Sequence, residues 1–397
     1  MNPAADASSS VVIEHVDLRH SKDGRTLSAL VDGEHVWFRF PADLQIEPRA
    51  DVFLPAALFE AMIRDAPIVV RGEAGVSARL ATALASLQAI FHCWNTDLKV
   101  VPLEAMTVTA TRNLPGAICC FSGGVDSTYS FARHRDQISH LLVVQGFDNW
   151  KSERDWKQSA AERGRLAEAQ GVRLIAVESN VRAFIEQRRI YWGLVLGSVL
   201  GGIGAALAPA RFFIPASWTW RDLHPYGSHP LTDPLWSTEA TEVVHDGADT
   251  SRSRKIAFIA DQPSLLDQLQ VCWNSTAHNC GKCPKCIRTS AVLHMLGRTS
   301  ANLPPGNFPN DLRRLAVDGT ATLPYVEDLI SYATACGAED MKRKLISIRR
   351  RYRVRSAFDE FAKALLGDSA RRIKQRVMRR EWQTYRAALH SSRTGIA

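Results

Sequence analysis

The feature of this chain that most constrains its fold is an alternation of short apolar segments with helical segments. Five β-favouring segments follow one another, each followed by a turn or a helix-like stretch: residues 117–121, 140–147, 173–179, 211–217 and 241–247. Strands that alternate with helices favour parallel pairing, because a parallel connection needs a long crossover. The sequence therefore predicts an α/β protein with a doubly wound parallel sheet, whose ligand binds at the carboxyl ends of the strands.

The segments on either side of this pattern predict further domains. Before it, Asp32-Gly33 lies between two β-favouring runs and predicts a hairpin, while Pro55 and Ser77 suit the starts of two helices. After it, a proline-rich connection leads to a helical end. We therefore expect a small α+β domain, an α/β domain with a metal-binding loop, and a basic helical region, over residues 1–112, 113–300 and 301–397.

Composition favours a soluble protein. Of its 397 residues, 46% are hydrophobic and 23% are charged, and the N-terminus lacks a cationic start followed by an apolar run. We expect a cytoplasmic protein without a membrane partner. Residues 190–210 carry no charge over the length of a membrane span, but their five glycines favour a buried helix packed closely on the sheet.

A glycine turn, Ser122–Ser127 (SGGVDS), follows the first of the five strands and precedes a helix. Gly123 and Gly124 allow a positive φ and a close approach of backbone amides, and the helix start and the serine hydroxyls favour an anion. The turn predicts a phosphate site, although it lacks the lysine of nucleoside triphosphate loops. Cys119 and Cys120, which precede it in an apolar strand, are expected to be inert core residues rather than nucleophiles.

The turn resembles the SGGxDS signature of the N-type ATP pyrophosphatases, the PP-loop enzymes, which split ATP between its α and β phosphates. The resemblance implies that ATP and Mg²⁺ are cofactors and that Asp126 lies near the metal. It also implies that Asp126 and Ser127 take part in catalysis, and that the pyrophosphate is surrounded by Ser122, Gly123, Gly124, Val125, Asp126 and Ser127.

Four cysteines predict a second site. They are spaced C-x7-C-x2-C-x2-C and are Cys272, Cys280, Cys283 and Cys286. Four thiolates can close a tetrahedral site for Zn²⁺, and Lys282, Lys285 and Arg288 would offset its negative charge. Such a site has no open position and is expected to be structural. An iron–sulfur cluster is the alternative.

The pairing of the two motifs over residues 114–298 resembles the 7-cyano-7-deazaguanine synthase family. This resemblance implies an ATP-dependent, AMP-forming ligase that adenylates a carboxylate or similar oxygen for attack by ammonia or an amine. Two departures indicate a divergent relative. Residues 145–148 (QGFD) replace the family's Tyr-Gly-Gln motif, and residues 247–252 (GADTSR) only loosely match a later motif.

Two segments after the fourth and fifth strands supply candidate substrate residues. Ser228, His229 and Asp233 lie in a segment rich in polar and aromatic residues, which could also be a stiff proline-rich connection. The charges that follow the fifth strand suit a carboxylate or phosphate, or mark only a helix start: Asp249, Arg252 and Lys255.

The C-terminal tail is strongly basic. From residue 341 onward it holds seventeen Lys and Arg against four Asp and Glu, a net of +13 in a chain whose total is +8. It could bind RNA or an acidic protein, or stay solvated with one face packed.

Two other functions remain open: a PP-loop enzyme that modifies tRNA, including by thiolation, and a catalytically silent nucleotide-binding component of a defence or polysaccharide system. A homodimer is also open.

Overall fold

The computed structural model describes most of the chain, over residues 10–147, 152–272, 274–275, 278–315, 317, 322–358 and 361. It divides into two compact units, Met1–Phe308 and Pro309–Ala397. In the second unit the described elements are helical: η4 (Asn310–Arg314), α10 (Leu323–Ala335) and a helix over residues 339–358. The greater part of the basic tail, from residue 362 onward, lies outside the described residues.

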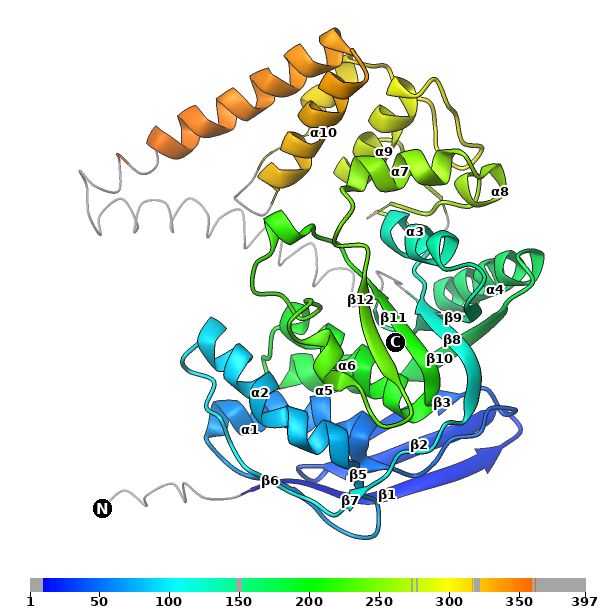
Figure 1. Ribbon diagram of the computed structural model, residues 1–397, viewed down its shortest axis with the longest axis vertical. Helices are drawn as coiled ribbons and strands as arrows, with labels where there is room; N and C mark the ends of the chain where they lie inside the picture. The colour runs from blue at the N-terminus through cyan, green and yellow to red at the C-terminus, as the bar shows by residue number, and fades with distance from the viewer. Residues whose placement is uncertain are drawn as a thin grey trace. The chain divides into compact units, whose positions relative to one another are not determined.

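The first unit is built on one ten-stranded sheet, with the strand order β12-β11-β8-β9-β10-β3-β2-β1-β4-β6 (Figure 1). Its strands are β1 (Val11–Ser21), β2 (Gly24–Val31), β3 (Glu34–Phe40), β4 (Ile68–Val70), β6 (Leu103–Glu104), β8 (Leu114–Cys120), β9 (Ile138–Val144), β10 (Arg173–Ser179), β11 (Pro209–Pro215) and β12 (Glu242–Asp246). A separate parallel pair joins β5 (Val76–Ser77) and β7 (Thr107–Val108).

The five strands from β8 to β12 are the ones that the sequence predicts, and they pair in parallel throughout. β8 lies in the middle, hydrogen-bonded to β9 on one side and to β11 on the other, so that Cys119 pairs with both Leu141 and Phe213. The chain therefore leaves β8 in one direction and later crosses to its other side. The predicted α/β fold is confirmed, and its large central sheet is mostly parallel.

The first hundred residues continue this sheet. β10 pairs antiparallel with β3, where Glu178 opposes Arg39 and their side chains form an ion pair of 2.9 Å. The predicted hairpin connects β2 to β3, with Asp32 and Gly33 both in the left-handed region at φ 51° and 79°. β1, which the sequence analysis did not predict, extends the antiparallel part. The three domain ranges remain a prediction.

Helices cover both faces of the sheet (Figure 1). One face carries η1 (Ala50–Phe53), α1 (Leu54–Arg64), α2 (Ala78–Trp94), α5 (Val181–Gln187) and α6 (Trp192–Leu207). On the other face lie α3 (Val125–Arg133) and α4 (Glu153–Ala169). α7 (Arg252–Ala260) packs on α3 and contacts α8 (Pro263–Leu266) and α9 (Pro284–Met295). Short η2 (Trp220–Asp222) and η3 (Asp233–Trp236) lie between β11 and β12. The largest apolar cluster fills the space under the first group.

The glycines of α6 allow three neighbouring residues to approach its backbone closely. A Cβ on Gly197 would lie 2.0 Å from the carbonyl oxygen of Gly227, and one on Gly201 or Gly204 would meet Trp236 or Phe212 within 3 Å. Because α6 is almost entirely buried, the predicted buried helix is confirmed. Among the described residues, no helix has the length and apolar character needed to span a bilayer.

Gly197→Ala is expected to lower the free energy of unfolding by about 1 to 3 kcal/mol, since the added methyl group overlaps the Gly227 carbonyl. Gly164→Ala is the matched control in α4, where the nearest atom to the new Cβ would be Leu174 Cδ2 at 3.9 Å. It is expected to be neutral or to stabilise by up to about 1 kcal/mol. Urea unfolding followed by circular dichroism measures both, and equal midpoints would contradict the close packing.

Candidate functional site

The glycine turn forms a tight bend between β8 and α3. Gly123 has φ 76°, a conformation that L-residues with a Cβ rarely adopt, and Gly124 precedes the first helical residue. The buried Ser127 hydroxyl donates to the Gly124 carbonyl (3.1 Å) and accepts from the Ser122 amide (3.2 Å). The first amides of α3 have no carbonyl partner within the helix, so this end of α3 can bind an anion.

Two other elements hold the turn in place. Arg163 of α4 donates from Nε to the Ser122 carbonyl at 3.1 Å, and its Nη2 also donates to this oxygen. On the other side, the Gln270 amide donates to the Gly123 carbonyl at 2.8 Å. Each of these contacts uses a backbone carbonyl of the turn. Of the turn's amides, that of Ser122 donates to Ser127 Oγ and that of Gly124 donates to Ser122 Oγ at 3.3 Å, so the amides at the start of α3 are the main donors left for a ligand.

A cleft of about 320 Å³ opens beside the turn, at the carboxyl ends of β8, β9 and β11. In parallel sheets ligands bind at this edge, where the strand order reverses. Its lining includes the charged side chains of Arg163, Arg252 and Lys285. It also includes apolar side chains, among them Phe147, Leu196, Leu200 and Ile214. A second pocket of about 440 Å³ lies at the opposite, amino-terminal ends of the strands, among Arg79, Arg112 and Arg211. We take the first as the candidate site because of its position in the sheet.

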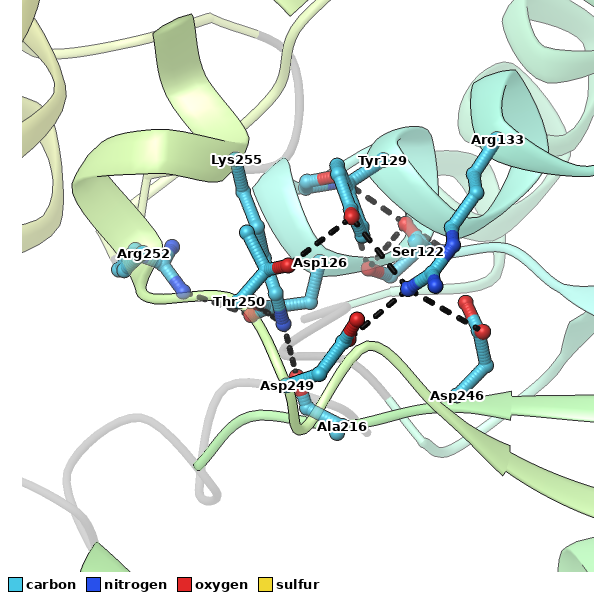
Figure 2. A network of polar contacts seen from close by, with 12 residues as sticks. Ser122, Asp126, Tyr129, Arg133, Ala216, Asp246, Asp249, Thr250, Arg252 and Lys255 are labelled. Carbon is cyan, nitrogen blue, oxygen red and sulfur yellow. Dashed lines mark hydrogen bonds and ion pairs between the residues drawn. The ribbon is translucent and has the colours of Figure 1, made fainter. Parts of the chain in front are cut away.

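Asp126 forms the electrostatic centre of the candidate site (Figure 2). One carboxylate oxygen accepts from Arg252 at 2.6 Å and the other from Lys255 at 3.3 Å. All three side chains are largely buried, with 17%, 10% and 2% of their surfaces exposed. Burial raises the pKa of Asp126, but the charges of Arg252 and Lys255 outweigh it and lower this pKa from 3.8 to about 2. Asp126 is therefore ionised, and the cluster carries a net positive charge.

The segment after β12 packs on α3 through further polar contacts (Figure 2). Lys255 also donates to the Ala216 carbonyl at 2.7 Å, which joins the end of β11 to this cluster. Asp249 is half exposed and pairs with Arg133 at 2.8 Å, so the hydrogen bond to Arg133 lowers its pKa. Of the three charged residues predicted here, Arg252 lines the cleft, Lys255 supports Asp126, and Asp249 pairs with α3 outside the lining.

The three candidates in the segment after β11 are close together but have different surroundings. Ser228 lines the cleft and donates to the buried Asp233 at 2.8 Å. His229 is buried against Trp94, with ring centroids 5.0 Å apart. Its burial lowers its pKa, and the nearby His245 lowers this pKa further. Asp233 accepts from Ser228, from His245 and from the His229 amide. Only Ser228 among the three is placed to touch a ligand in the cleft.

Cys119 and Cys120 lie in the buried end of β8. Burial raises the pKa of both thiols well above the ordinary value. A nearby carboxylate raises the pKa of Cys119 further, and Cys119 does the same to Cys120. A thiol held in its protonated form is a poor nucleophile. The structure supports their interpretation as core residues, with Cys120 contributing to the wall of the cleft.

The four predicted cysteines converge, with all four sulfur atoms within 4.8 Å of one another. Backbone amides point at three of the sulfurs: those of Lys282 and Cys283 donate to Cys280, that of Asn274 to Cys272, and that of Cys286 to Cys283. The pKa of Cys286 is raised by its hydrogen bond with Cys283 and by burial. Crowded thiols and convergent amides suit a thiophilic cation that replaces the protons, so this group could bind a metal such as zinc.

The cysteine cluster and the cleft share one segment. Cys272, Ser275 and Lys285 line the cleft, and Asn279 braces the segment by accepting from the Val271 amide at 2.8 Å. Since Gln270 also holds the glycine turn, a metal at the cysteines would fix one wall of the candidate site.

Several lining residues were not predicted as ligand contacts. Arg163 lies in a charged helix that resembles any solvated helix in sequence, and Lys285 was interpreted only as a counter-charge for the cysteines. Phe147 and Tyr226 also line the cleft. Phe147 is the last residue of the predicted strand segment 140–147, and Tyr226 lies in the segment after the fourth strand that supplies Ser228. These positions were the available signals.

The fold and the cleft define an α/β protein with a candidate ligand site at the carboxyl edge of its parallel strands. No family model, curated protein or solved structure matches this chain. The chemistry of the site therefore has to be inferred from its own residues.

The purified protein is expected to contain about one zinc ion per chain, measured by inductively coupled plasma mass spectrometry. Cys283→Ser is expected to lose most of this metal and to unfold at a lower temperature, since Cys283 also caps α9. Cys93→Ser changes an exposed cysteine outside the cluster and should keep its metal. Iron with visible absorption would favour a cluster, and protein free of both metals when purified without chelators would contradict the prediction.

Asp126 is expected to make stability depend on pH in the acid range. Because its pKa is lower in the folded chain, its contribution is present above the unfolded value of 3.8 and is lost as the pH falls through about 2. The difference in unfolding free energy between wild type and Asp126→Asn should thus be constant near neutral pH and shrink by about 2 kcal/mol between about pH 4 and pH 2. Denaturant titrations at each pH measure it, and a difference that does not change with pH would refute the ion-pair assignment.

Proposed function

We propose that this chain is an ATP-dependent, AMP-forming ligase of the PP-loop type. It adenylates a carboxylate or similar oxygen of an acceptor, and ammonia or an amine then displaces AMP. The observation that carries the proposal is the position of the SGGVDS turn, between a central parallel strand and a helix, at a cleft with buried cations.

The turn and its neighbours suit the pyrophosphate of ATP. Amides at the start of α3 offer hydrogen bonds to phosphate oxygens, and Ser122, whose hydroxyl accepts from the Gly124 amide at 3.3 Å, lines the same cleft. Arg252 and Lys285 line the same cleft and supply positive charge. In a site with little water these groups stabilise the negative charge that develops on pyrophosphate as the bond to the α phosphorus breaks.

Among the described residues, Asp126 and its neighbours do not form a magnesium site by themselves. Both oxygens of Asp126, the carboxylate of the glycine turn, already accept from Arg252 and Lys255. In this proposal, Mg²⁺ therefore arrives as a partner of the nucleotide and is not a resident ion held by Asp126.

The reaction consists of two substitutions. In the first, the acceptor oxygen attacks the α phosphorus and pyrophosphate leaves, which gives an acyl adenylate. In the second, the amine attacks the acyl carbon and AMP leaves with the electron pair of the C–O bond, while the amine loses a proton. Binding both reactants in one cleft replaces encounters in solution by a positioned attack.

The test is AMP formation that depends on an acceptor. Purified protein with ATP, Mg²⁺, ammonium and a small-molecule extract is expected to release AMP and pyrophosphate in equal amounts, measured by chromatography and a coupled pyrophosphate assay. Asp126→Asn should lower the rate at least about 100-fold, since it removes the partner that fixes both cations. Asp136→Asn changes an exposed aspartate in the segment between α3 and β9 and should keep the wild-type rate.

Other outcomes would replace this proposal. ATP binding in equilibrium dialysis without AMP under any extract would favour the silent nucleotide-binding protein. AMP formation only with a tRNA fraction would favour the RNA-modifying enzyme. Release of ADP instead of AMP would contradict cleavage between the α and β phosphates.

A further inference from the structure

α6 forms one wall of the cleft. Beside this wall lies a polar group that the proposed function does not use, the hydroxyl of Ser228. Ser228 is half-buried and lines the cleft together with Leu196, Leu200 and Ile214, all of which are apolar. A hydroxyl on such a wall is a point at which a ligand can be recognised, because a buried hydrogen bond discriminates between ligands better than apolar contact does.

Backbone packing fixes the position of Ser228. The preceding residue, Gly227, donates from its amide to the Gly193 carbonyl at 2.7 Å, and its own carbonyl lies against Gly197. These contacts press the chain onto the helix with no side chain between. Ser228 therefore has little freedom to move away from the cleft.

A buried carboxylate fixes the orientation of the Ser228 hydroxyl. Asp233 is fully buried, and its Oδ2 lies 2.8 Å from Ser228 Oγ and 2.7 Å from His245 Nδ1. Its Oδ1 accepts from the His229 amide at 3.2 Å. A carboxylate only accepts hydrogen bonds, so the proton of Ser228 points at Asp233, and the lone pairs of Oγ are left to accept from a ligand.

We propose that Ser228 is a specificity residue that accepts a hydrogen bond from an N–H or O–H group on an otherwise apolar part of the ligand, with Asp233 as its positioning residue. That this ligand is the acceptor of adenylation rests on the proposed function. The recognition of a donor group does not rest on the proposed function, because it follows from the contacts among Ser228, Asp233 and His245 alone.

Two isomeric probes test this without ATP or turnover. 3-Methylindole and 1-methylindole have the same size and apolar surface, but only the first has an N–H donor. Wild-type protein is expected to bind 3-methylindole about 3- to 10-fold more tightly in ligand-observed NMR titrations. Ser228→Ala should remove this preference by lowering the affinity for 3-methylindole and leaving that for 1-methylindole unchanged.

Thr232→Val is the matched control. It removes another hydroxyl that donates within the same segment, to the His229 carbonyl, but Thr232 is fully buried and does not line the cleft. This variant should keep the preference. Equal binding of the two isomers by wild type, binding of neither, or a preference that survives in Ser228→Ala would each overturn the proposal. The wild-type titration can overturn the proposal even if a variant fails to fold.

Discussion

Parallel pairing of β8 with β9 on one side and β11 on the other is the interaction on which the candidate site depends. Parallel strands run in the same direction, so their carboxyl ends meet at one edge, and the segments that leave them must converge there. The glycine turn, the end of β9 and the segment holding Ser228 come together for this reason, although more than a hundred residues separate the first from the last.

The burial of charged side chains at this edge costs desolvation free energy. Asp126, Arg252 and Lys255 are all largely buried, and removing charged groups from water offsets much of the attraction between them. Stability alone is therefore a weak reason for three charged side chains here. Their arrangement leaves a fixed excess of positive charge beside a turn whose geometry suits an anion, and this is a property that a site for phosphate requires.

The sequence predicted local structure well where the local signals were strong. The strand at 173–179 has the predicted bounds, Ser77 caps α2 as expected, and the glycine-rich segment forms a buried helix. It did not predict β1, although β1 pairs with its neighbour β2. The sequence also did not predict that β3 pairs with β10, because the pairing of distant strands cannot be read from either strand alone. Arg163 was missed for the same reason, since its partner Ser122 is 41 residues away.

By itself, the sequence determined the elements and the residue types of both candidate sites: a turn that favours glycine at Gly123, and four cysteines spaced for a metal. Backbone conformation and ligand spacing are local properties, so they can be read from neighbouring residues. The tertiary structure alone decided that Asp126 pairs with two basic side chains, that Asp249 lies outside the cleft lining, and that Asp233 orients Ser228. Those partners depend on which strand ends meet, and that is settled by packing of the whole sheet and its helices.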